Sequence, residues 1–465
     1  MLSVGESRGS PSPREGDGGR AYVPSGAFRP CAPTQALPRR GRETAGAGGG
    51  ASTTLRWLLA GAVAASLVAC AGRVTLHGAI DALYAGQVTA ADVTLAQYGK
   101  KVRGNDWLLY LLNAGVVKQV IGDYRESNRL LAAAEERVEV LLTRSVSRET
   151  ASFLVNDQTR AYAGAAYEQA LINYYKAVNY LLLGEVGEAV VECRRLDVRL
   201  GDLAGRIGTA GLFGEEAFLR YFTGVIYEAA GEAPDAMVAY RNALALYGKG
   251  GAMPPDVPAA AVRLARHLGF ADEVAAVLGA FPLAADAPVA AATVVVVVDA
   301  GRAPYKVSES VIIPTPHGFP ARLSLPRLTG GSGGRRAVAV TVGEVRDTAY
   351  PVEDVAAVAG RELDDRRGRD LARLVARAVA KELAAQEARR KGGDVAEVLV
   401  RVANIATEVA DTRSWESLPA QIYLARLPVV AGAATLEVAV DGRRIAQEPL
   451  EIHDGTTVFR KYRVF

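Results

Sequence analysis

Residues 224–243 read GVIYEAAGEAPDAMVAYRNA, a pattern typical of two short helices joined by a tight turn. Gly224 would let the two helices approach closely, and Gly231 would form the turn between them. Ala236 would be a small contact residue, and Tyr240 and Ala243 would pack the second helix against the first. We therefore expect an antiparallel helix pair whose apolar face needs a neighbouring pair to bury it.

The same offsets recur upstream, so this pair is one of a series. The second match consists of Ala177, Tyr180, Gly184, Ala189, Cys193 and Leu196, and the third of Gly115, Gly122, Tyr124, Ser127, Leu131 and Ala134. A weaker match begins near Tyr84 and Gly86. The pattern resembles tetratricopeptide repeats and predicts an irregular α-solenoid over residues 70–281, with an insertion around 145–165. The alternative is a generic helical bundle with glycine turns.

An Ala/Pro/Asp stretch at 282–292 predicts a linker, and beyond it the apolar period changes from helical to two. We expect a domain at 293–465 that is α+β, with a mostly antiparallel sheet and helices inserted in its middle. Helices are expected from Pro351 to Lys391, with a break near Gly368, and from Val395 to Thr407. Asp441-Gly442 predicts a hairpin turn. The expected strands are 293–299, 321–325, 337–342, 421–427, 435–440, 444–450 and 457–464.

The apolar run from Trp57 to Ala69 ends in Leu67-Val68-Ala69-Cys70, which resembles the lipobox of bacterial lipoproteins. The run has the length of a signal-peptide core and is short for a bilayer span of about 20 residues. The resemblance implies that a leader and signal peptide, residues 1–69, is removed and that Cys70 carries diacylglycerol and an acyl chain such as palmitate. Because Ala71 rather than Asp follows the cysteine, the same resemblance implies the periplasmic face of the outer membrane. The alternative is an ordinary core cysteine in a buried helix.

The charge balance argues against general binding of nucleic acid. The 465-residue chain has a net charge of +3, with 54 basic and 51 acidic residues. The leader holds eight arginines and four acids, so the mature chain would carry 46 basic and 47 acidic residues. Of the three cysteines, only Cys193 lies outside the leader and the lipobox, so no internal disulfide is expected. Cys193 falls at a packing position, which predicts a buried, inert thiol.

No motif in the chain predicts catalysis, a cofactor or a metal site. The loop Gly330-Gly331-Ser332-Gly333-Gly334 spells G-x-S-x-G, but it joins two expected strands instead of a strand and a helix. The histidines at 77, 267, 317 and 453 are scattered and lack the spacing of metal ligands. We therefore expect a protein that is not an enzyme.

Two longer strings carry a family resemblance: LVNDQTRAYAGAAYEQALINYYKAVNYLLLGEVGEAVVECRR at 154–195 and ADTRSWESLPAQIYLARL at 410–427. They resemble uncharacterised bacterial envelope lipoproteins with N-terminal tetratricopeptide-like helices and a C-terminal α+β domain. The resemblance implies architecture and location only. The matching positions are Asn156, Asp157, Arg160, Tyr162, Tyr167, Glu168, Tyr174, Tyr175, Lys176, Asn179, Asp411, Arg413, Trp415, Leu418 and Pro419.

Two candidate binding sites follow from these positions. Tyr174 and Tyr221 occupy equivalent helix positions that are expected to face a peptide-binding groove, and Glu168 and Lys176, two turns apart, are expected to bracket a polar contact. The resulting hypothesis is a lipid-anchored scaffold that binds envelope proteins or peptides through its repeats. The alternative is an enzyme or a small-molecule or glycan binder that acts on envelope polymers. It would use a cleft formed by Arg413, Trp415, Arg373 and Arg377.

Overall fold

The computed structural model describes residues 75–145, 161–207, 213–249, 252–282, 291–314, 320–332 and 334–465. The leader 1–69, Cys70, Asn156, Asp157, Arg160 and most of the expected linker lie outside these residues. Contacts group Gly72–Phe465 as one compact unit. The expected fold class, helix pairs followed by an α+β region, is confirmed within it.

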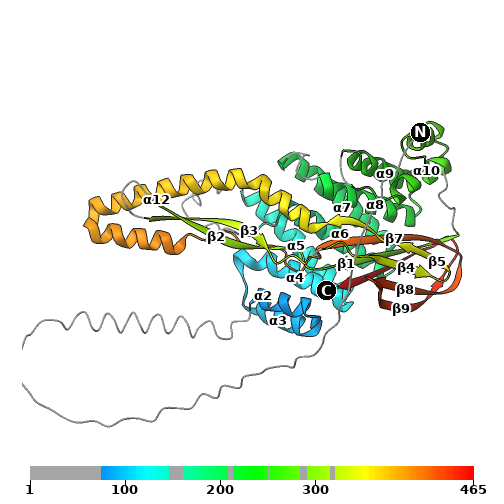
Figure 1. The fold of residues 1–465 in the computed structure, drawn as a ribbon, viewed down its shortest axis with the longest axis horizontal. Helices are drawn as coiled ribbons and strands as arrows, with labels where there is room; N and C mark the ends of the chain where they lie inside the picture. The colour runs from blue at the N-terminus through cyan, green and yellow to red at the C-terminus, as the bar shows by residue number, and fades with distance from the viewer. Residues whose placement is uncertain are drawn as a thin grey trace, which may run out of the picture. The chain divides into compact units, whose positions relative to one another are not determined.

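The N-terminal half of the described chain consists of antiparallel helix pairs (Figure 1). Each of the four expected pairs is present, and a further pair follows them. Gly231 has a φ of +77°, a left-handed conformation that suits glycine at the turn between the fourth pair's helices. The pairs are α2 (Leu76–Tyr84) with α3 (Val88–Lys101), α4 (Trp107–Ile121) with α5 (Tyr124–Ser145), α6 (Ala166–Leu182) with α7 (Val186–Ile207), α8 (Phe213–Ala229) with α9 (Ala233–Tyr247), and α10 (Asp256–Leu268) with α11 (Ala271–Ala280).

The packing inside a pair follows the role expected of Gly224. A Cβ atom added at Gly224 would lie 2.8 Å from the Tyr240 ring on the second helix of the pair, closer than packed carbon atoms come. Glycine at this position therefore lets the ring lie across the first helix. Cys193 is buried as expected, and burial raises the pKa of its thiol far above the usual range.

The C-terminal half forms two four-stranded sheets and a separate two-stranded hairpin. In the first sheet the order is β10-β1-β7-β6, where β1 pairs parallel with β10 and antiparallel with β7. The second sheet, β5-β4-β8-β9, is antiparallel, and Asp441-Gly442 makes its expected hairpin turn with φ of +50° and +78°. The strands are β1 (Ala292–Ala300), β2 (Tyr305–Pro314), β3 (Pro320–Thr329), β4 (Val338–Val342), β5 (Val345–Thr348), β6 (Tyr350–Asp354), β7 (Gln421–Val429), β8 (Gly432–Val440), β9 (Arg443–Ile452) and β10 (Thr457–Val464).

Strand β1 is buried on both faces, because the first sheet lies between the helices and the second sheet. Val294, Val296 and Val298 join the core between the two sheets. Val295 and Val297 point the other way and join the core formed by the helices. The helix pairs and the first sheet therefore share one continuous core.

The longest element, α12 (Val355–Thr407), corrects one expectation. The helix passes through Gly368 unbroken and bends at Gly393, whose φ of +74° and ψ of −170° are not helical. The two helical limbs of α12 and the β2–β3 hairpin extend together from the rest of the fold, and we call this projection the arm (Figure 1). Strands β2, β5 and β6 were not expected from the sequence.

Candidate functional site

Tyr174 and Tyr221 do not line an open groove, so that prediction is wrong. Both side chains are buried in the core shared by the helices and the first sheet. Tyr174 packs edge-on against Phe218 and Phe222, and the hydroxyl of Tyr221 donates a 2.8 Å hydrogen bond to Asp256. Helices α6 and α8, which carry these tyrosines, face the protein's own sheet, and this sheet fills the place expected for a peptide.

A buried charge cluster joins that sheet to α6. Asp299 on β1 accepts contacts from two cations on the parallel neighbour β10, Lys461 at 3.0 Å and Arg463 at 3.4 Å. The hydroxyl of Tyr175 on α6 donates to the same Asp299 oxygen over 3.3 Å. Burial lowers the pKa of Lys461, against the opposing effect of Asp299. The three charged side chains all belong to the first sheet, and the Tyr175 hydroxyl links them to α6.

A second cluster joins α8 and α10 to β7. The carboxylate of Glu228 lies 2.8 Å from Arg426 of β7 and 2.8 Å from Arg263 of α10. It also accepts a 2.9 Å hydrogen bond from the hydroxyl of Tyr240. Burial favours the neutral acid, but the two arginines outweigh it and lower the pKa of Glu228 to about 2. This carboxylate is therefore ionised across the physiological range.

The string at 410–427 makes a third set of contacts, between its first residues and the helices. The backbone N–H of Trp415 donates a 2.7 Å hydrogen bond to Glu168 at the start of α6, and the Trp415 indole packs 5.5 Å from the Tyr175 ring. Arg413 pairs with Asp411 at 2.8 Å and with Asp106 at 3.2 Å. The segment before β7 is thus held against α4 and α6.

The structure does not assemble the expected cleft. Arg413 and Trp415 lie at the seam between helices and sheet, where Trp415 is completely buried. Arg377 belongs to the arm and pairs with Glu408 at 3.1 Å, while Arg373 is exposed and lies 3.8 Å from Asp370. These four residues therefore do not form one site.

Glu168 and Lys176 were expected to bracket one polar contact, but the structure gives them separate partners. Glu168 serves the N-terminus of α6, where it accepts a 2.7 Å hydrogen bond from the backbone of Ala165. Lys176 is buried between Glu135, at 2.7 Å, and Glu192, at 2.9 Å. Each residue stabilises a separate junction between helices.

Within the described residues, no group of three or more histidine, cysteine or acidic side chains is placed to hold a metal ion. The same part of the chain contains no helix with the length and apolarity needed to cross a membrane.

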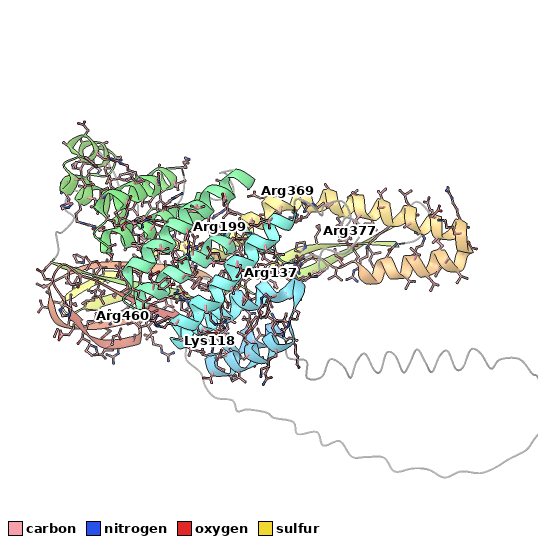
Figure 2. All side chains as sticks on the ribbon, turned by 180° about the vertical axis from the view of Figure 1, so that it is seen from behind. Lys118, Arg137, Arg199, Arg369, Arg377 and Arg460 are labelled. Carbon is pink, nitrogen blue, oxygen red and sulfur yellow. The ribbon has the colours of Figure 1, made fainter. Side chains whose placement is uncertain are left out.

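The arm has an unusual distribution of charge, because several of its ionised side chains point inward. Arg401 on the second limb of α12 reaches Glu382 on the first at 2.6 Å and Glu397 at 2.9 Å. Glu408, just beyond the helix, is buried and pairs with Arg377 and Lys381. Figure 2 labels Arg377 in the part of α12 that runs beside the β2–β3 hairpin. These ion pairs hold the two limbs of the arm together.

The outward side of the first limb carries the apolar residues instead. Leu371, Val375, Val379 and Leu383 recur every four residues and are 45–60% exposed. Between residues 374 and 386 the only charged side chains are the inward Arg377, Lys381 and Glu382. We call this uncharged outward side, with Ala372 and Ala376 beside the four larger residues, the arm face. It extends for about 18 Å along the helix.

The second limb repeats the inverted pattern. Val395, Val398, Leu399 and Val402 are 46–73% exposed, while Glu397 and Arg401 are buried. A soluble helix normally places its apolar stripe against the core and its charges in water. The site predicted from the sequence included only arginines of this region. The recurrence of Leu and Val at every fourth residue is visible in the sequence and would have indicated the apolar stripe.

No protein-family model and no curated protein sequence matches the chain. Among solved structures, the chain is similar to MamA, with 14% identity over 44% of this chain and 93% of that one, at a TM-score of 0.29. It is also similar to the apo form of RapI, with 11% identity over 45% of this chain and 69% of that one, at 0.32. A tetratricopeptide repeat protein from Parabacteroides merdae matches with 15% identity over 44% of this chain and 65% of that one, at 0.30.

Proposed function

We propose that this chain is a lipid-anchored protein of the bacterial envelope that acts as a protein-interaction scaffold, and that its arm is the part that meets the partner. The arm face carries this proposal, because a continuous apolar surface on a folded protein marks an interaction site. The sequence Leu67-Val68-Ala69-Cys70 supports the anchor.

The rest of the fold supports the choice of the arm over the repeats. Helices α6 and α8 pack against the first sheet, and the carboxylates of Asp299 and Glu228 pair with cations at that seam. Other large apolar residues exposed on the repeats, such as Val198 and Val238, stand singly, which is normal on protein surfaces. The repeats therefore serve as a rigid body that holds the sheet and projects the arm.

Membrane fractionation combined with site-specific photocrosslinking tests the proposal. A photoreactive residue replaces Val379 on the arm face or, as the matched control, Val198, which is 66% exposed on α7. We expect a discrete crosslinked adduct from position 379 and none from 198. We also expect the Cys70→Ala variant to leave the membrane fraction.

Two results would contradict the proposal. Equal crosslinking from both positions would remove the arm as the interaction surface. Unchanged fractionation of the Cys70→Ala variant would remove the anchor.

A further inference from the structure

The arm face is symmetric about its own midpoint. Leu371 and Leu383 are equidistant from Arg377 along the helix, and so are Val375 and Val379. If two copies of this helix lay antiparallel, each leucine would meet a leucine and each valine a valine. A twofold symmetric dimer requires this kind of surface, which is complementary to itself.

The charges at the two ends of the arm face obey the same symmetry with opposite signs. Asp364 and Asp365 precede the apolar stripe, and Arg389 and Arg390 follow it at the same distances from Arg377. At 100° per residue, these four positions fall on the same side of the helix as Leu371, Val375, Val379 and Leu383. Arg389 also contacts Asp394 at 3.1 Å and Glu397 at 3.5 Å within its own chain. In an antiparallel pair the acidic end of each copy would lie over the basic end of the other.

The alanines beside the stripe favour a close approach. Ala372 and Ala376 are exposed and follow Leu371 and Val375 by one position. Small side chains next to rows of larger ones allow the ridges of one helix to enter the grooves of the other. The arm face thus combines apolar surface, room for approach and charge complementarity with a copy of itself.

We propose that the partner of the arm face is a second copy of this chain, in an antiparallel, twofold symmetric dimer centred near Arg377. This proposal rests on the proposed function, since it names the partner of the same surface.

Sedimentation velocity of the full-length chain, purified in nonionic detergent at low salt, tests the dimer. We expect the wild-type chain and the control Val198→Asp to sediment as dimers. The double variant V375D/V379D should dissociate at least tenfold more readily, because it places four like charges in the contact.

Charge exchange tests the antiparallel arrangement. The variants D364R/D365R and R389D/R390D each oppose like charges in a dimer with themselves, so each should be weakened. An equal mixture of the two should form a heterodimer, and the chain that carries both sets of changes should dimerise again. High salt should reduce these differences, because exposed charges are screened. Helix content measured by circular dichroism checks that each variant is folded.

Three results would overturn the proposal: a wild-type chain that stays monomeric, equal association of V375D/V379D and V198D, or a mixture that does not rescue association. Flotation with anionic vesicles that depends on Val375 and Val379, in a monomeric chain, would assign the face to lipid. A crosslink from position 379 to a different protein, with a monomeric chain, would refute the dimer and leave the scaffold function in place.

Discussion

Replacing Asp299 by asparagine tests how much the buried charge cluster contributes to stability. The substitution keeps the size of the side chain and removes its negative charge. Lys461 would then keep only the ring faces of Tyr175 and Tyr174, whose centroids lie 4.3 and 5.4 Å from its nitrogen. Arg463 would keep its hydrogen bonds to Tyr84 at 2.7 Å and to the carbonyl of Ser417 at 2.9 Å.

The expected cost follows from which charges lose their partner. Breaking a buried ion pair by removing one member costs about 3–5 kcal/mol, because the remaining charge is buried without compensation. Asp299 and Lys461 are both almost inaccessible to solvent, so the pair belongs to this class. We expect Asp299→Asn to lower the free energy of unfolding by about 3–5 kcal/mol.

A second substitution separates the charge effect from a loss of packing. Asp299→Asn leaves the buried Lys461 ammonium without its carboxylate partner. The double variant D299N/K461M removes that ammonium as well, so part of the lost stability should return. The exposed Asp454, in the turn before β10, provides the matched control, and Asp454→Asn should change stability by less than about 0.5 kcal/mol.

Equilibrium unfolding of the full-length chain in urea, followed by far-ultraviolet circular dichroism, measures these differences. The slope against urea concentration should be the same for all variants, so that the midpoints report stability. A free energy of unfolding of Asp299→Asn within 1 kcal/mol of the wild-type value would contradict the expected contribution of the ion pair. Additive decreases in the free energy of unfolding from D299N and K461M in the double variant would also contradict it, because two residues that form an ion pair are coupled.

Further predictions concern the Glu228 cluster and the glycines of the repeats. The pKa of Glu228 is lowered from about 4.5 to about 2 on folding, so its contribution of about 3 kcal/mol is complete above pH 5 and is lost as the pH falls toward 2. Glu228→Gln should flatten the decline of stability between pH 5 and pH 2 in urea titrations, and an unchanged slope would contradict the assignment. Gly224→Ala should cost about 1–3 kcal/mol, since its Cβ would meet the Tyr240 ring at 2.8 Å. Gly201→Ala, on an exposed helix position with open space around it, should instead raise stability by up to about 1 kcal/mol. Thermal denaturation measures both changes, and shifts of the two glycine variants in the same direction would refute one of these two predictions.

The repeats could be predicted from the sequence because their signals are local. The turn glycines and the small contact residues recur at fixed offsets within about thirty residues, and each pair needs little information from elsewhere. The strands β7 to β10 were also predicted, since alternation and the Asp441-Gly442 turn are local signals. The break in α12 was placed at Gly368 because a glycine weakens any helix, yet the conformation at Gly393 is what ends the limb.

The seam could not be predicted, because it depends on contacts between distant parts of the chain. Tyr174 has the spacing of a helix residue that faces outward from its pair, and nothing in that spacing shows that β10 will cover it. The burial of the Lys461 and Arg463 side chains was equally hidden, since charged residues at alternate positions of a strand normally indicate a solvated face. Only the pairing of β10 with β1 places these cations beside Asp299.

The helix pairs and the first sheet form one cooperative unit around a filled seam. Hydrogen–deuterium exchange of the full-length chain with increasing urea measures this directly, by following peptides from α6 and β1. We predict that the amides of Ala166–Leu182 and Ala292–Ala300 lose their protection together, at the free energy of global unfolding. Fast exchange in α6 while β1 stays protected would contradict the shared core. It would also support the rejected hypothesis of a peptide-binding groove along the first helices of the repeats.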